Sequence, residues 1–452
     1  MKIKPALPKG TRDFLPKEVA RRNYIFDTIK TVFRKYGFEQ IETPAFETLQ
    51  TLTGKYGEEG DKLLFKILNS GDYLVKAKEQ LTNVSLKELD AKQLASHISE
   101  KGLRYDHTVP LARYVVQHQD ELAFPFKRFA VGPVWRADRP QKGRYQEFYQ
   151  FDADVIGSAS LLNEVELTMI YAEVFKLLNI PATVKLNNRK LIDDIFEFAG
   201  VKEEKAKAIT AIDKLDKIGW EGDKGVAGEL KNLGLSDETI TTLRSLVLDK
   251  SFPELKETLQ GSVGVAEVEN VMQHFSHNPM VQFNAALMRG LDYYTGTVWE
   301  IALNDDRVSI GSLGGGGRYD NLTEIFGAQG MTGVGISFGI ERVYIVMEEL
   351  GLFPDSLSEG VKVLFVPRDS SVEEFTFSQV KALRQAGIPA EIFLGNVKKQ
   401  KHFNYAEQKG IVYMVEIGAN EVESKSFRLR HVKERREEGS GFTLESLKLK
   451  LA

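Results

Sequence analysis

Several arginines occupy positions where their side chains could bind an anion. Arg136 and Arg144 bracket a short polar turn, and Arg342 falls in the first turn of the helix expected after Gly339. The planar guanidinium group matches the oxygens of carboxylates and phosphates. A cation in the first turn opposes the helix dipole, and a bound phosphate would reverse that effect. These positions suggest an anion site, and ordinary surface charge is the alternative for each arginine.

Acids, amides and phenols gather in further segments. Gln150 and Asp154 are expected to share one face of a strand, although a plain half-exposed strand would also explain both. The segment Arg289–Gly296 places a cation, an acid, two phenols and two glycines directly before a strand. Its glycines would let the backbone approach a ligand, and its phenols could form hydrogen bonds from an apolar wall. The run Gly314–Gly317 permits a similar approach or a flexible turn, and it is not a P-loop because no Gly-Lys-Ser/Thr follows.

The elements that would position these residues follow from apolar periodicity. Residues 126–138 alternate between apolar and polar positions, and residues 145–156 resume as a second strand. Together they predict a long β-hairpin with a basic tip at residues 139–144. Further strands are expected at residues 38–43, 296–303, 308–313 and 333–339, and helices at 18–36, near 85–100, and at 162–178, 319–326 and 340–350.

Two other regions differ in character. Residues 190–280 are rich in Lys, Glu, Asp and Leu with helical periodicity, and they predict a mostly helical insertion. After a linker at residues 352–360, strands alternate with helices, which predicts a small α/β domain with a mainly parallel sheet. Its strands are expected at residues 361–366, 390–394 and 411–417, and its helices at 373–386 and 398–409.

The composition limits the class of protein. The 452 residues are 42% hydrophobic and 27% charged, which is typical of a globular chain with roughly two to four domains. No stretch approaches the ~20 apolar residues that cross a bilayer, so no membrane association is expected. Without cysteine there is no disulfide framework, no Cys-ligated zinc and no thiol nucleophile, which fits a cytoplasmic protein.

Charge is distributed unevenly along the chain. Residues 361–452 contain 16 Lys and Arg against 12 Asp and Glu, so this region carries +4 and the remainder −8 of a total of −4. The positive charge of this region falls in two clusters, which are either solvated helix faces or a patch that binds phosphates. The positive residues gather at Lys398, Lys399 and Lys401, and at Arg428, Arg430, Lys433, Arg435 and Arg436.

Taken together, these segments resemble the histidyl-tRNA synthetases, which are class II aminoacyl-tRNA synthetases. Lys9–Pro16 is similar to the opening signature of that family, and Arg289–Gly296 is similar to its histidine-specific signature. The first helix, its strand and Pro44 resemble motif 1 of class II enzymes, Arg136–Asp154 resembles motif 2, and Gly333–Val343 resembles motif 3 with Arg342 as its arginine. Residues 361–452 resemble the anticodon-binding domain. The resemblance covers essentially the whole chain and is weakest between residues 190 and 280.

The resemblance implies an α+β catalytic domain, built on an antiparallel sheet with flanking helices, in residues 1–186 and 284–352. It also implies a mostly helical insertion in residues 187–283 and a C-terminal α/β anticodon-binding domain in residues 361–452. The implied ligase activates L-histidine with ATP to histidyl-adenylate and transfers histidine to the 3′ terminal ribose of tRNA(His). A cytoplasmic homodimer joined through motif 1 is expected. Mg2+ is expected with ATP, and no motif identifies its ligands.

The family's site residues map onto this chain one by one. An acid and a phenol suit an imidazole because each ring nitrogen can be given a partner. The implied histidine-binding residues are Asp106, Thr108 and Gln150 for the α-amino group, Asp154 and Tyr294 for the imidazole with Tyr293 close by, and Gly314–Gly317 as the pocket floor. The implied catalytic residues are Arg136, on the substrate carboxylate and α-phosphate, and Arg289, on the α-phosphate where other class II enzymes place a metal ion. The implied nucleotide contacts are Asp138, Arg144 on the triphosphate, and Arg342 on the adenine and outer phosphates, while Arg139 and Gln141 would meet the acceptor end of tRNA.

Two alternatives and one departure accompany this interpretation. A histidine-sensing paralogue that regulates a biosynthetic phosphoribosyltransferase would bind histidine without aminoacylation, but such paralogues generally lack an intact histidine signature and the anticodon domain. A synthetase for another amino acid is disfavoured by Arg289–Gly296. His107 stands where the family pattern suggests a small or apolar residue, and a structural role is favoured over a catalytic one.

Overall fold

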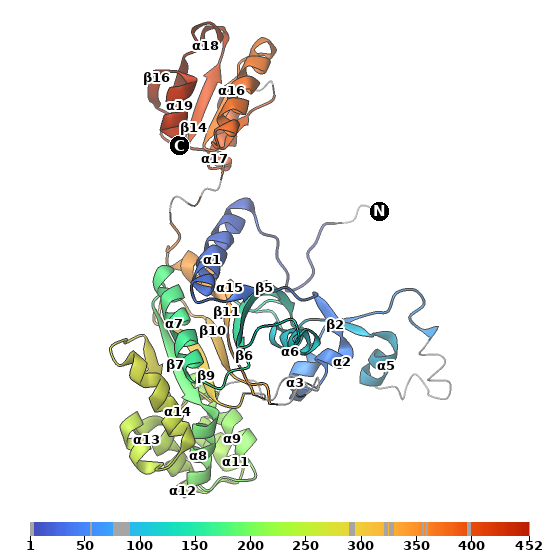
Figure 1. Ribbon diagram of the computed structural model, residues 1–452, viewed down its shortest axis with the longest axis vertical. Coiled ribbons are helices and arrows are strands. Elements are labelled where there is room, and N and C mark those ends of the chain that lie inside the picture. The colour runs from blue at the N-terminus through green and yellow to red at the C-terminus, as the bar shows by residue number, and fades with distance from the viewer. Residues whose placement is uncertain are drawn as a thin grey trace. The chain divides into compact units, whose positions relative to one another are not determined.

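The computed structural model describes residues 4–54, 57–75, 91–288, 294–320, 324, 330–354, 357, 360–395 and 399–451. The chain forms two compact units, one of Met1–Phe14 with Arg21–Phe353 and one of Leu15–Ala20 with Pro354–Ala452. Figure 1 labels many of the helices and strands in both units. Among the described residues no helix is both long and apolar enough to cross a membrane.

The first unit is built on an eight-stranded sheet with the order β1-β5-β6-β11-β10-β9-β7-β8. Neighbouring strands are antiparallel except at the two edges, where β1 runs parallel to β5 and β8 runs parallel to β7. The expected antiparallel sheet is therefore confirmed. Its strands are β1 (Glu39–Gln40), β5 (Phe126–Trp135), β6 (Glu147–Ile156), β7 (Ala182–Asn188), β8 (Val281–Phe283), β9 (Thr297–Leu303), β10 (Gly314–Arg318) and β11 (Gly333–Gly339).

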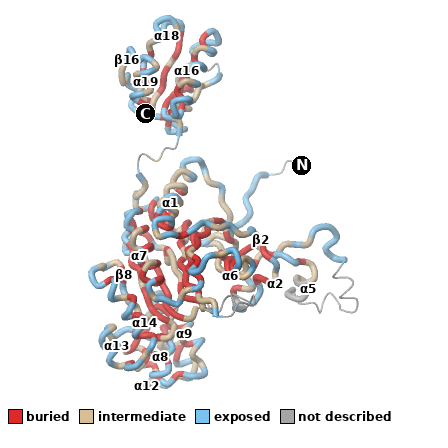
Figure 2. The backbone as a smooth tube through the Cα atoms, in the orientation of Figure 1, coloured by how far each residue is buried: buried red, intermediate tan, exposed pale blue. Residues whose placement is uncertain are grey.

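One face of this sheet is apolar and is covered by helices. Phe33 of α1 (Pro16–Lys35) and Tyr171 of α7 (Leu162–Leu177) both pack on Phe338 of β11. Their ring centroids lie 6.0 and 4.8 Å, respectively, from the ring centroid of Phe338. These side chains belong to one continuous core. Figure 2 colours the chain by residue burial, and buried residues predominate along α7 and the neighbouring strands. The alternation of side chains along each strand leaves the polar residues on the opposite face.

A smaller sheet and several helices complete the N-terminal part of this unit. The sheet has the order β2-β4-β3, with both pairs antiparallel. The polar helix expected near residues 85–100 matches a helix at Ala91–Ile98, and the rest of that prediction lies outside the described residues. The elements here are β2 (Phe46–Thr48), β3 (Lys66–Ile67), β4 (Lys101–Leu103), α2 (Leu49–Leu52), α3 (Gly57–Lys62), α5 (Ala91–Ile98) and α6 (Thr108–Gln117).

The segment between β7 and β8 is helical, as predicted. Its first helix buries Leu191, Ile192, Ile195 and Phe196, an apolar stripe at helical spacing. These side chains share the core of the large sheet, so the insertion has no separate core among the described residues. Its bounds at residues 187–283 stay a prediction. The helices are α8 (Arg189–Phe198), α9 (Lys205–Ile212), α10 (Leu215–Ile218), α11 (Val226–Asn232), α12 (Asp237–Arg244), a π turn at Ser245–Asp249, α13 (Phe252–Thr258), α14 (Val263–Met272) and a 3-10 turn at Gln273–Phe275.

The glycine run after β9 overturns one element prediction. No strand forms at residues 308–313, whereas Gly314–Arg318 is a strand in the middle of the sheet, paired with β9 and β11. Glycine is needed because a Cβ at Gly316 would lie 2.2 Å from the carbonyl oxygen of Gly335. The short strand predicted at residues 38–43 is limited to Glu39–Gln40. The helix predicted at residues 319–326 lies mostly outside the described residues.

The second unit has a five-stranded sheet of order β13-β12-β14-β15-β16. The three strands that were predicted are parallel, and two antiparallel strands at one edge were missed. The sheet is therefore mixed, not mainly parallel. The first of the missed strands alternates charged and apolar residues, and the second contains a single apolar side chain, Phe442. The elements are β12 (Val363–Pro367), β13 (Ala390–Ile392), β14 (Tyr413–Ile417), β15 (Phe427–His431), β16 (Glu437–Phe442), α16 (Glu373–Gln385), α17 (Lys399–Gln408), α18 (Ala419–Ser424), α19 (Leu444–Leu451) and a 3-10 turn at Ser370–Val372.

The basic residues of the second unit are largely paired with acids. Arg428 lies 3.5 Å from Glu437, and Arg435 lies 3.2 Å from Glu407. Arg436 pairs with Glu434 on the same loop. Much of the positive charge seen in the sequence is thus balanced locally, and the pairs are exposed enough that salt screens them.

Candidate active site

The polar face of the large sheet is centred on strand β6. Gln150, Asp152 and Asp154 alternate with apolar residues along β6, so all three side chains leave the same face. Asp154 is opposite Arg128 of β5 and Gly335 of β11, and Asp152 is opposite Ser337 of β11. The expectation that Gln150 and Asp154 share a face is thus confirmed.

Asp154 lies between a cation and a phenol in the interior. Its Oδ2 is 2.6 Å from Nη2 of Arg128, whose side chain is 0% exposed. The hydroxyl of Tyr319 donates to Oδ1 of Asp154. Burial raises the pKa of Asp154, whereas Arg128 and the Tyr319 hydrogen bond act to lower it. Gly335 leaves the space for this carboxylate, because a Cβ there would lie 2.0 Å from Oδ1.

Asp152 has a different set of neighbours on the same strand. The Ser337 hydroxyl donates to Oδ1 of Asp152 at 2.5 Å, and Nε2 of Gln150 donates to that hydroxyl oxygen at 3.0 Å. Burial raises the pKa of Asp152 to about 7, against the lowering effect of Arg128. A pKa of about 7 means that Asp152 readily takes up a proton near neutral pH.

A small cavity connects these groups to two other elements. Its volume is about 20 Å³, which is room for roughly one water molecule. Glycines of β10 and β11 form one wall, and polar side chains form the others. The cavity is lined by Thr108, Asp152, Asp154, Tyr294, Gly315, Gly316, Tyr319, Gly335, Ile336 and Ser337.

The start of helix α6 borders this cavity. Oδ1 of Asp106 accepts hydrogen bonds of 3.0 Å from the backbone N–H groups of Thr108 and Val109, so Asp106 caps the helix. His107 is 2% exposed, and its Nε2 lies 3.3 Å from the carbonyl oxygen of Gly132. Burial, with two nearby arginines, lowers the pKa of His107 to about 3, so the ring is neutral at physiological pH.

A second group of charged residues surrounds the β5–β6 turn. Nε of Arg136 donates to the carbonyl oxygen of Tyr105 at 3.1 Å, and the guanidinium lies 4.2 Å from the Tyr105 ring centroid. Arg144 is 3.6 Å from Asp138. Arg342 donates to the carbonyl oxygens of Gly143, at 3.2 Å, and Ser312, at 2.6 Å. Arg342 therefore links the turn to the first turn of α15 (Ile340–Glu349).

The N-terminal segment packs against the same turn. Gly10 accepts a hydrogen bond of 2.8 Å from the backbone of Gln146. Arg12 donates to the Tyr145 hydroxyl at 3.1 Å and to Glu341 of α15 at 2.6 Å. The segment thus ties the hairpin to α15, which explains why a signature so far from the other motifs belongs with them.

Comparison with known proteins decides the family. The histidyl-tRNA synthetase profile matches residues 10–84 and 85–343, and an anticodon-binding domain profile matches residues 361–450. The chain belongs to the histidyl-tRNA synthetase family. It is 47% identical to a histidine–tRNA ligase of Christiangramia forsetii and 48% identical to one of Bacteroides fragilis, and each match covers 96% of both chains. A crystal structure of histidyl-tRNA synthetase from Nostoc sp. PCC 7120 superimposes with a TM-score of 0.79 at 28% identity, over 100% of both chains.

Membership of this family establishes the activity of the chain. It is a class II aminoacyl-tRNA synthetase that ligates histidine to tRNA at the expense of ATP. The two-unit architecture, with a large mixed sheet and a C-terminal anticodon-binding domain, is that of the synthetase fold. The alternative of a histidine-sensing paralogue is not favoured, because the relatives named as ligases match almost the entire chain.

The structure brings most of the implied histidine residues together. Thr108, Asp154 and Tyr294 line one cavity, Asp106 caps the helix beside it, and Gln150 bonds to Ser337 in its wall. The implied nucleotide residues Arg136, Asp138, Arg144 and Arg342 gather around the β5–β6 turn, where Arg139 and Gln141 are exposed. Arg289 and Tyr293 lie outside the described residues.

Several residues of the site were not found from the sequence. Arg128, Asp152, Ser337 and Tyr319 all have polar contacts in the cavity region. A pairing of the predicted hairpin strands would have placed Arg128 opposite Asp154, so the signal existed for this one. The contact of Ser337 with Asp152 depends on the register of β6 with β11, and the contact of Tyr319 with Asp154 joins residues 165 positions apart. Neither can be read from periodicity.

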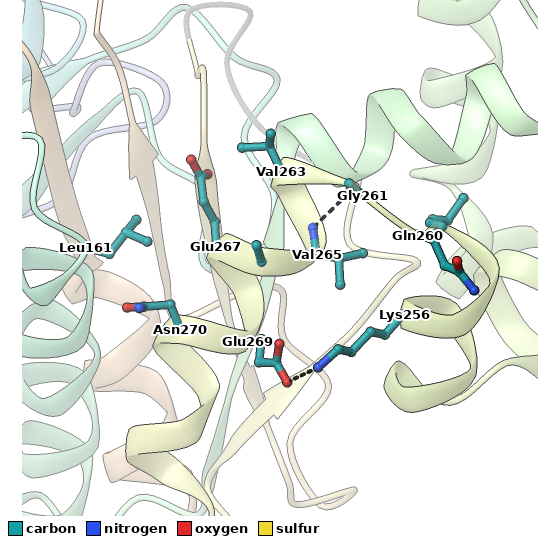
Figure 3. A pocket seen from close by; sticks show the side chains of 12 residues that line it. Leu161, Lys256, Gln260, Gly261, Val263, Val265, Glu267, Glu269 and Asn270 are labelled. Atoms are coloured by element: carbon teal, nitrogen blue, oxygen red, sulfur yellow. Dashed lines mark hydrogen bonds and ion pairs between the residues drawn. The ribbon is translucent and has the colours of Figure 1, made fainter.

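A larger hollow lies elsewhere, in the helical insertion. It has a volume of about 600 Å³ and opens between the end of α13 and the start of α14, with Leu161 on one side (Figure 3). Lys256 and Glu269 form an ion pair of 2.5 Å at its rim. None of the described residues implied for histidine or nucleotide binding lines this hollow.

Proposed function

We propose that histidine activation takes place on the polar face formed by β5, β6, β10 and β11. The observation that supports this most directly is the buried group of Asp154, Arg128 and Tyr319, next to Thr108 and Tyr294 in one cavity. A carboxylate and phenols around a small enclosed space are suited to an imidazole, which needs one partner on each nitrogen.

In this proposal Asp154 and Tyr294 bind the two imidazole nitrogens, with Tyr293 nearby. Arg128 favours the ionised form of Asp154, so the carboxylate can accept the ring N–H. Asp106, Thr108 and Gln150 bind the α-amino group. A site that satisfies both nitrogens rejects analogues that lack one, because its own buried groups would be left unpaired.

The nucleotide is proposed to bind against the β5–β6 turn and α15. Arg136 and Arg289 contact the α-phosphate, Arg136 also contacts the substrate carboxylate, and Arg342 lies against the adenine and outer phosphates. Asp138 and Arg144 complete the nucleotide contacts. Positively charged groups fixed in advance neutralise charge that develops on the phosphate, and no protein nucleophile is needed.

The reaction then proceeds in two steps. A carboxylate oxygen of histidine attacks the α-phosphorus of ATP and displaces pyrophosphate, which gives histidyl-adenylate. A terminal ribose hydroxyl of tRNA(His) attacks the acyl carbon, loses its proton and displaces AMP. Mg2+ would enter with ATP and screen its outer phosphates. Among the described residues, no group of three or more His, Asp or Glu side chains is placed to hold a metal ion.

Further parts of the assignment concern partners and organisation. Arg139 and Gln141, exposed at the turn, are proposed to contact the acceptor end of tRNA. The chain is proposed to act as a cytoplasmic homodimer joined through the first helix and its strand. The proposed domains are residues 1–186 with 284–352, 187–283 and 361–452.

The first test is histidine-dependent exchange of labelled pyrophosphate into ATP, measured with each of the twenty amino acids. We expect exchange with histidine alone, because only its side chain satisfies both Asp154 and Tyr294. Exchange with a different amino acid would overturn the pocket assignment. A folded protein that binds histidine without any exchange would instead support the sensing role.

A further inference from the structure

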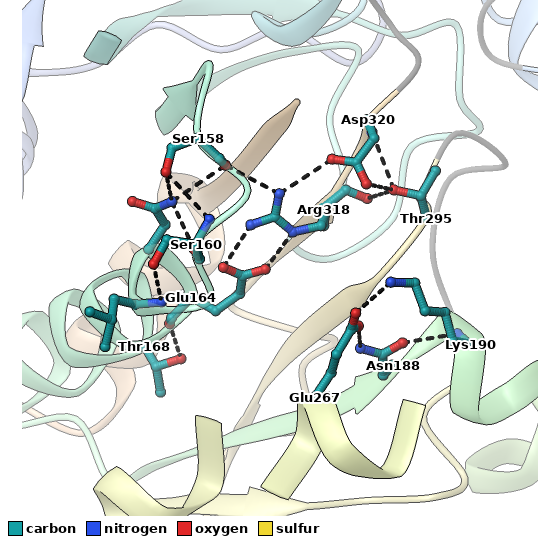
Figure 4. Close-up of polar contacts among 12 residues, drawn as sticks. Ser158, Ser160, Glu164, Thr168, Asn188, Lys190, Glu267, Thr295, Arg318 and Asp320 are labelled. Carbon is teal, nitrogen blue, oxygen red and sulfur yellow. Dashed lines mark hydrogen bonds and ion pairs between the residues drawn. The ribbon is translucent and has the colours of Figure 1, made fainter. Parts of the chain in front are cut away.

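A buried ion pair lies behind the proposed histidine pocket, on the helix-covered face of the sheet. Arg318 of β10 and Glu164 of α7 form two parallel contacts, Nε to Oε1 at 2.6 Å and Nη2 to Oε2 at 2.8 Å. Arg318 is 4% exposed and Glu164 is 0% exposed. Figure 4 shows the guanidinium in the centre of a larger polar network. Both ends of this bidentate pair are thus fixed in orientation.

The network continues from Arg318 to a threonine on another segment. Nη1 of Arg318 is 3.3 Å from Oδ1 of Asp320, and Oδ2 of Asp320 accepts a hydrogen bond of 2.8 Å from the Thr295 hydroxyl. The backbone N–H of Asp320 donates to the same hydroxyl oxygen at 3.2 Å. The backbone N–H of Thr295 donates to the Arg318 carbonyl oxygen at 2.8 Å. Two segments far apart in the sequence are therefore joined at one point (Figure 4).

The joined residues flank both phenols of the pocket. Arg318 and Asp320 are the neighbours of Tyr319, and Thr295 follows Tyr294. Tyr319 is also fixed by its backbone, whose N–H donates to Gly333 at 2.7 Å. The Tyr294 ring lies so close to β10 that a Cβ at Gly317 would be 2.6 Å from its Cδ1. A shift of Thr295 or Asp320 would therefore move a ring that lines the cavity.

We propose that Glu164, Arg318, Asp320 and Thr295 form a positioning unit that sets the placement of Tyr294 and Tyr319 and thereby the selectivity for the imidazole ring. The unit does not touch the substrate and acts through the two tyrosines. This inference rests on the proposed assignment of the cavity as the imidazole site.

Stability alone is a poor explanation for the arrangement. The desolvation of a buried ion pair opposes its Coulomb attraction, and well-packed apolar residues often serve as well or better. A hydrogen-bonded pair does, however, fix directions that apolar packing leaves free. Here the hydrogen bonds join Arg318 and Asp320, on either side of Tyr319, to Thr295, which follows Tyr294. The network is therefore placed where it can fix the orientation of both phenol rings.

The test is Thr295→Val, which keeps the side-chain shape and removes the hydroxyl that joins the two segments. Pyrophosphate exchange is measured with histidine and with β-(thiazol-4-yl)alanine, whose ring keeps one nitrogen and lacks the N–H. We expect the KM for histidine to rise about tenfold, with the KM for ATP changed by less than about twofold. The selectivity for histidine over the analogue should fall by a similar factor. A displaced Tyr319 would no longer orient Asp154, the proposed acceptor of the ring N–H that the analogue lacks.

A matched control is Thr183→Val in β7. It removes a hydroxyl that accepts a 2.6 Å hydrogen bond from Asn304. Thr183 belongs to the same sheet, but it pairs with Ala302, at the opposite end of β9 from Thr297. We expect its selectivity to equal that of the parent. If Thr295→Val lowers thermal stability as the control does and leaves selectivity intact, the unit is structural and the inference is wrong.

A second variant addresses the buried pair without leaving a charge unpaired. Arg318→Lys retains the positive charge and loses the bidentate geometry. We expect selectivity to fall in this variant too, with the kcat for histidine reduced less than kcat/KM. Unchanged selectivity in both variants would overturn the proposal. A parent protein that shows no histidine-dependent exchange would instead reject the function assigned to the cavity.

Discussion

At the residue scale, Asp152 and Asp154 illustrate how one strand can supply two different acids. Both lie beside Arg128, but Asp154 has the direct ion pair and Asp152 has the Ser337 hydroxyl. The pKa of Asp152 is raised to about 7, mainly by burial. With a pKa of about 7, Asp152 changes its charge within the physiological pH range.

This difference predicts a pH-dependent effect of Asp152→Asn. The ordinary pKa of the carboxyl is 3.8, so between that value and about 7 the folded protein keeps a proton that the unfolded chain has lost. Asp152 therefore lowers the free energy of unfolding progressively as the pH rises through this window, and no further above it. The melting temperature of the variant relative to the parent should increase from pH 5 to pH 7 and then level off.

His107 does not interfere with that comparison. Its pKa is lowered to about 3, so it destabilises the fold as the pH falls below 6.5, which is the opposite direction. Parent and variant share this contribution, and it cancels in their difference. A stability difference that is independent of pH would contradict the assignment to Asp152.

Individual side chains were predictable where a single element defines them. The shared face of Gln150 and Asp154 follows from the period of two, which a strand keeps regardless of its partners. Arg342 was singled out because it opposes the helix dipole, and its bonds to two carbonyl oxygens place it where the turn and α15 meet. Arg128 lies on β5 but acts on Asp154 of β6, so the residue pattern of β5 alone does not reveal its role.

At the element scale, strand β10 shows why a glycine run can be obligatory in a sheet. Its residues alternate between the helix-covered face, which holds Gly314, Gly316 and Arg318, and the polar face, which holds Gly315 and Gly317. On the first face there is no space beside the neighbouring backbone. On the second face Gly315 borders the cavity. From the sequence the run could be either a close backbone approach to a ligand or a flexible turn, because glycine carries no apolar periodicity.

The two faces of β10 predict opposite results for two alanine substitutions. A Cβ at Gly316 would lie 2.2 Å from the carbonyl oxygen of Gly335, so Gly316→Ala forces backbone movement and should cost about 3 kcal/mol or more. A Cβ at Gly315 would meet only the carbonyl oxygen of Trp299, at 3.1 Å, so Gly315→Ala should fold. Its methyl group would enter the cavity and raise the KM for histidine.

Denaturant unfolding and pyrophosphate exchange separate the two outcomes. Gly316→Ala should lower the urea midpoint strongly, whereas Gly315→Ala should keep a midpoint near that of the parent and lose histidine affinity. If Gly315→Ala bound histidine as the parent does, the cavity would not be the substrate site. If Gly316→Ala kept the parent midpoint, the close packing of β10 would be wrong.

At the scale of the whole molecule, the chain forms two units with separate cores. Val363, Phe365 and Leu447 belong to a core that contains only residues of the second unit. That separation predicts that the catalytic unit folds and works without residues 361–452. Pyrophosphate exchange by the truncated protein should stay within about threefold of the parent, whereas tRNA charging should fall more than 100-fold, equivalent to about 3 kcal/mol of lost binding.

The truncation needs a control for folding. Thermal unfolding of the truncated protein should retain the transition of the first unit. Equal loss of exchange and charging would mean that the second unit supports the catalytic unit itself, for example through dimerisation, and is not mainly a tRNA-binding domain.

At this scale, the helical stretch between β7 and β8 and the alternation of strands and helices in the second unit were predictable, because both are periodic features of long segments. The two edge strands of the second sheet were not. Phe427 and Leu429 face the core of that unit, but Arg428 and Arg430 between and beyond them made the segment look like a surface charge cluster. Two alternating apolar residues are a weak indication of a strand when several arginines surround them.

The order of strands in the large sheet has a consequence for synthesis on the ribosome. β6 ends at Ile156, and its neighbour β11 begins only at Gly333. A ribosome that adds roughly 5–20 residues per second needs on the order of 10–35 s to produce the stretch between them. Throughout that interval the edge of β6 that pairs with β11 is unpaired, and the carboxylates of Asp152 and Asp154 are still exposed to water. The face that carries the proposed histidine pocket is therefore among the last parts of the first unit to close, and nascent chains are vulnerable to aggregation until it does.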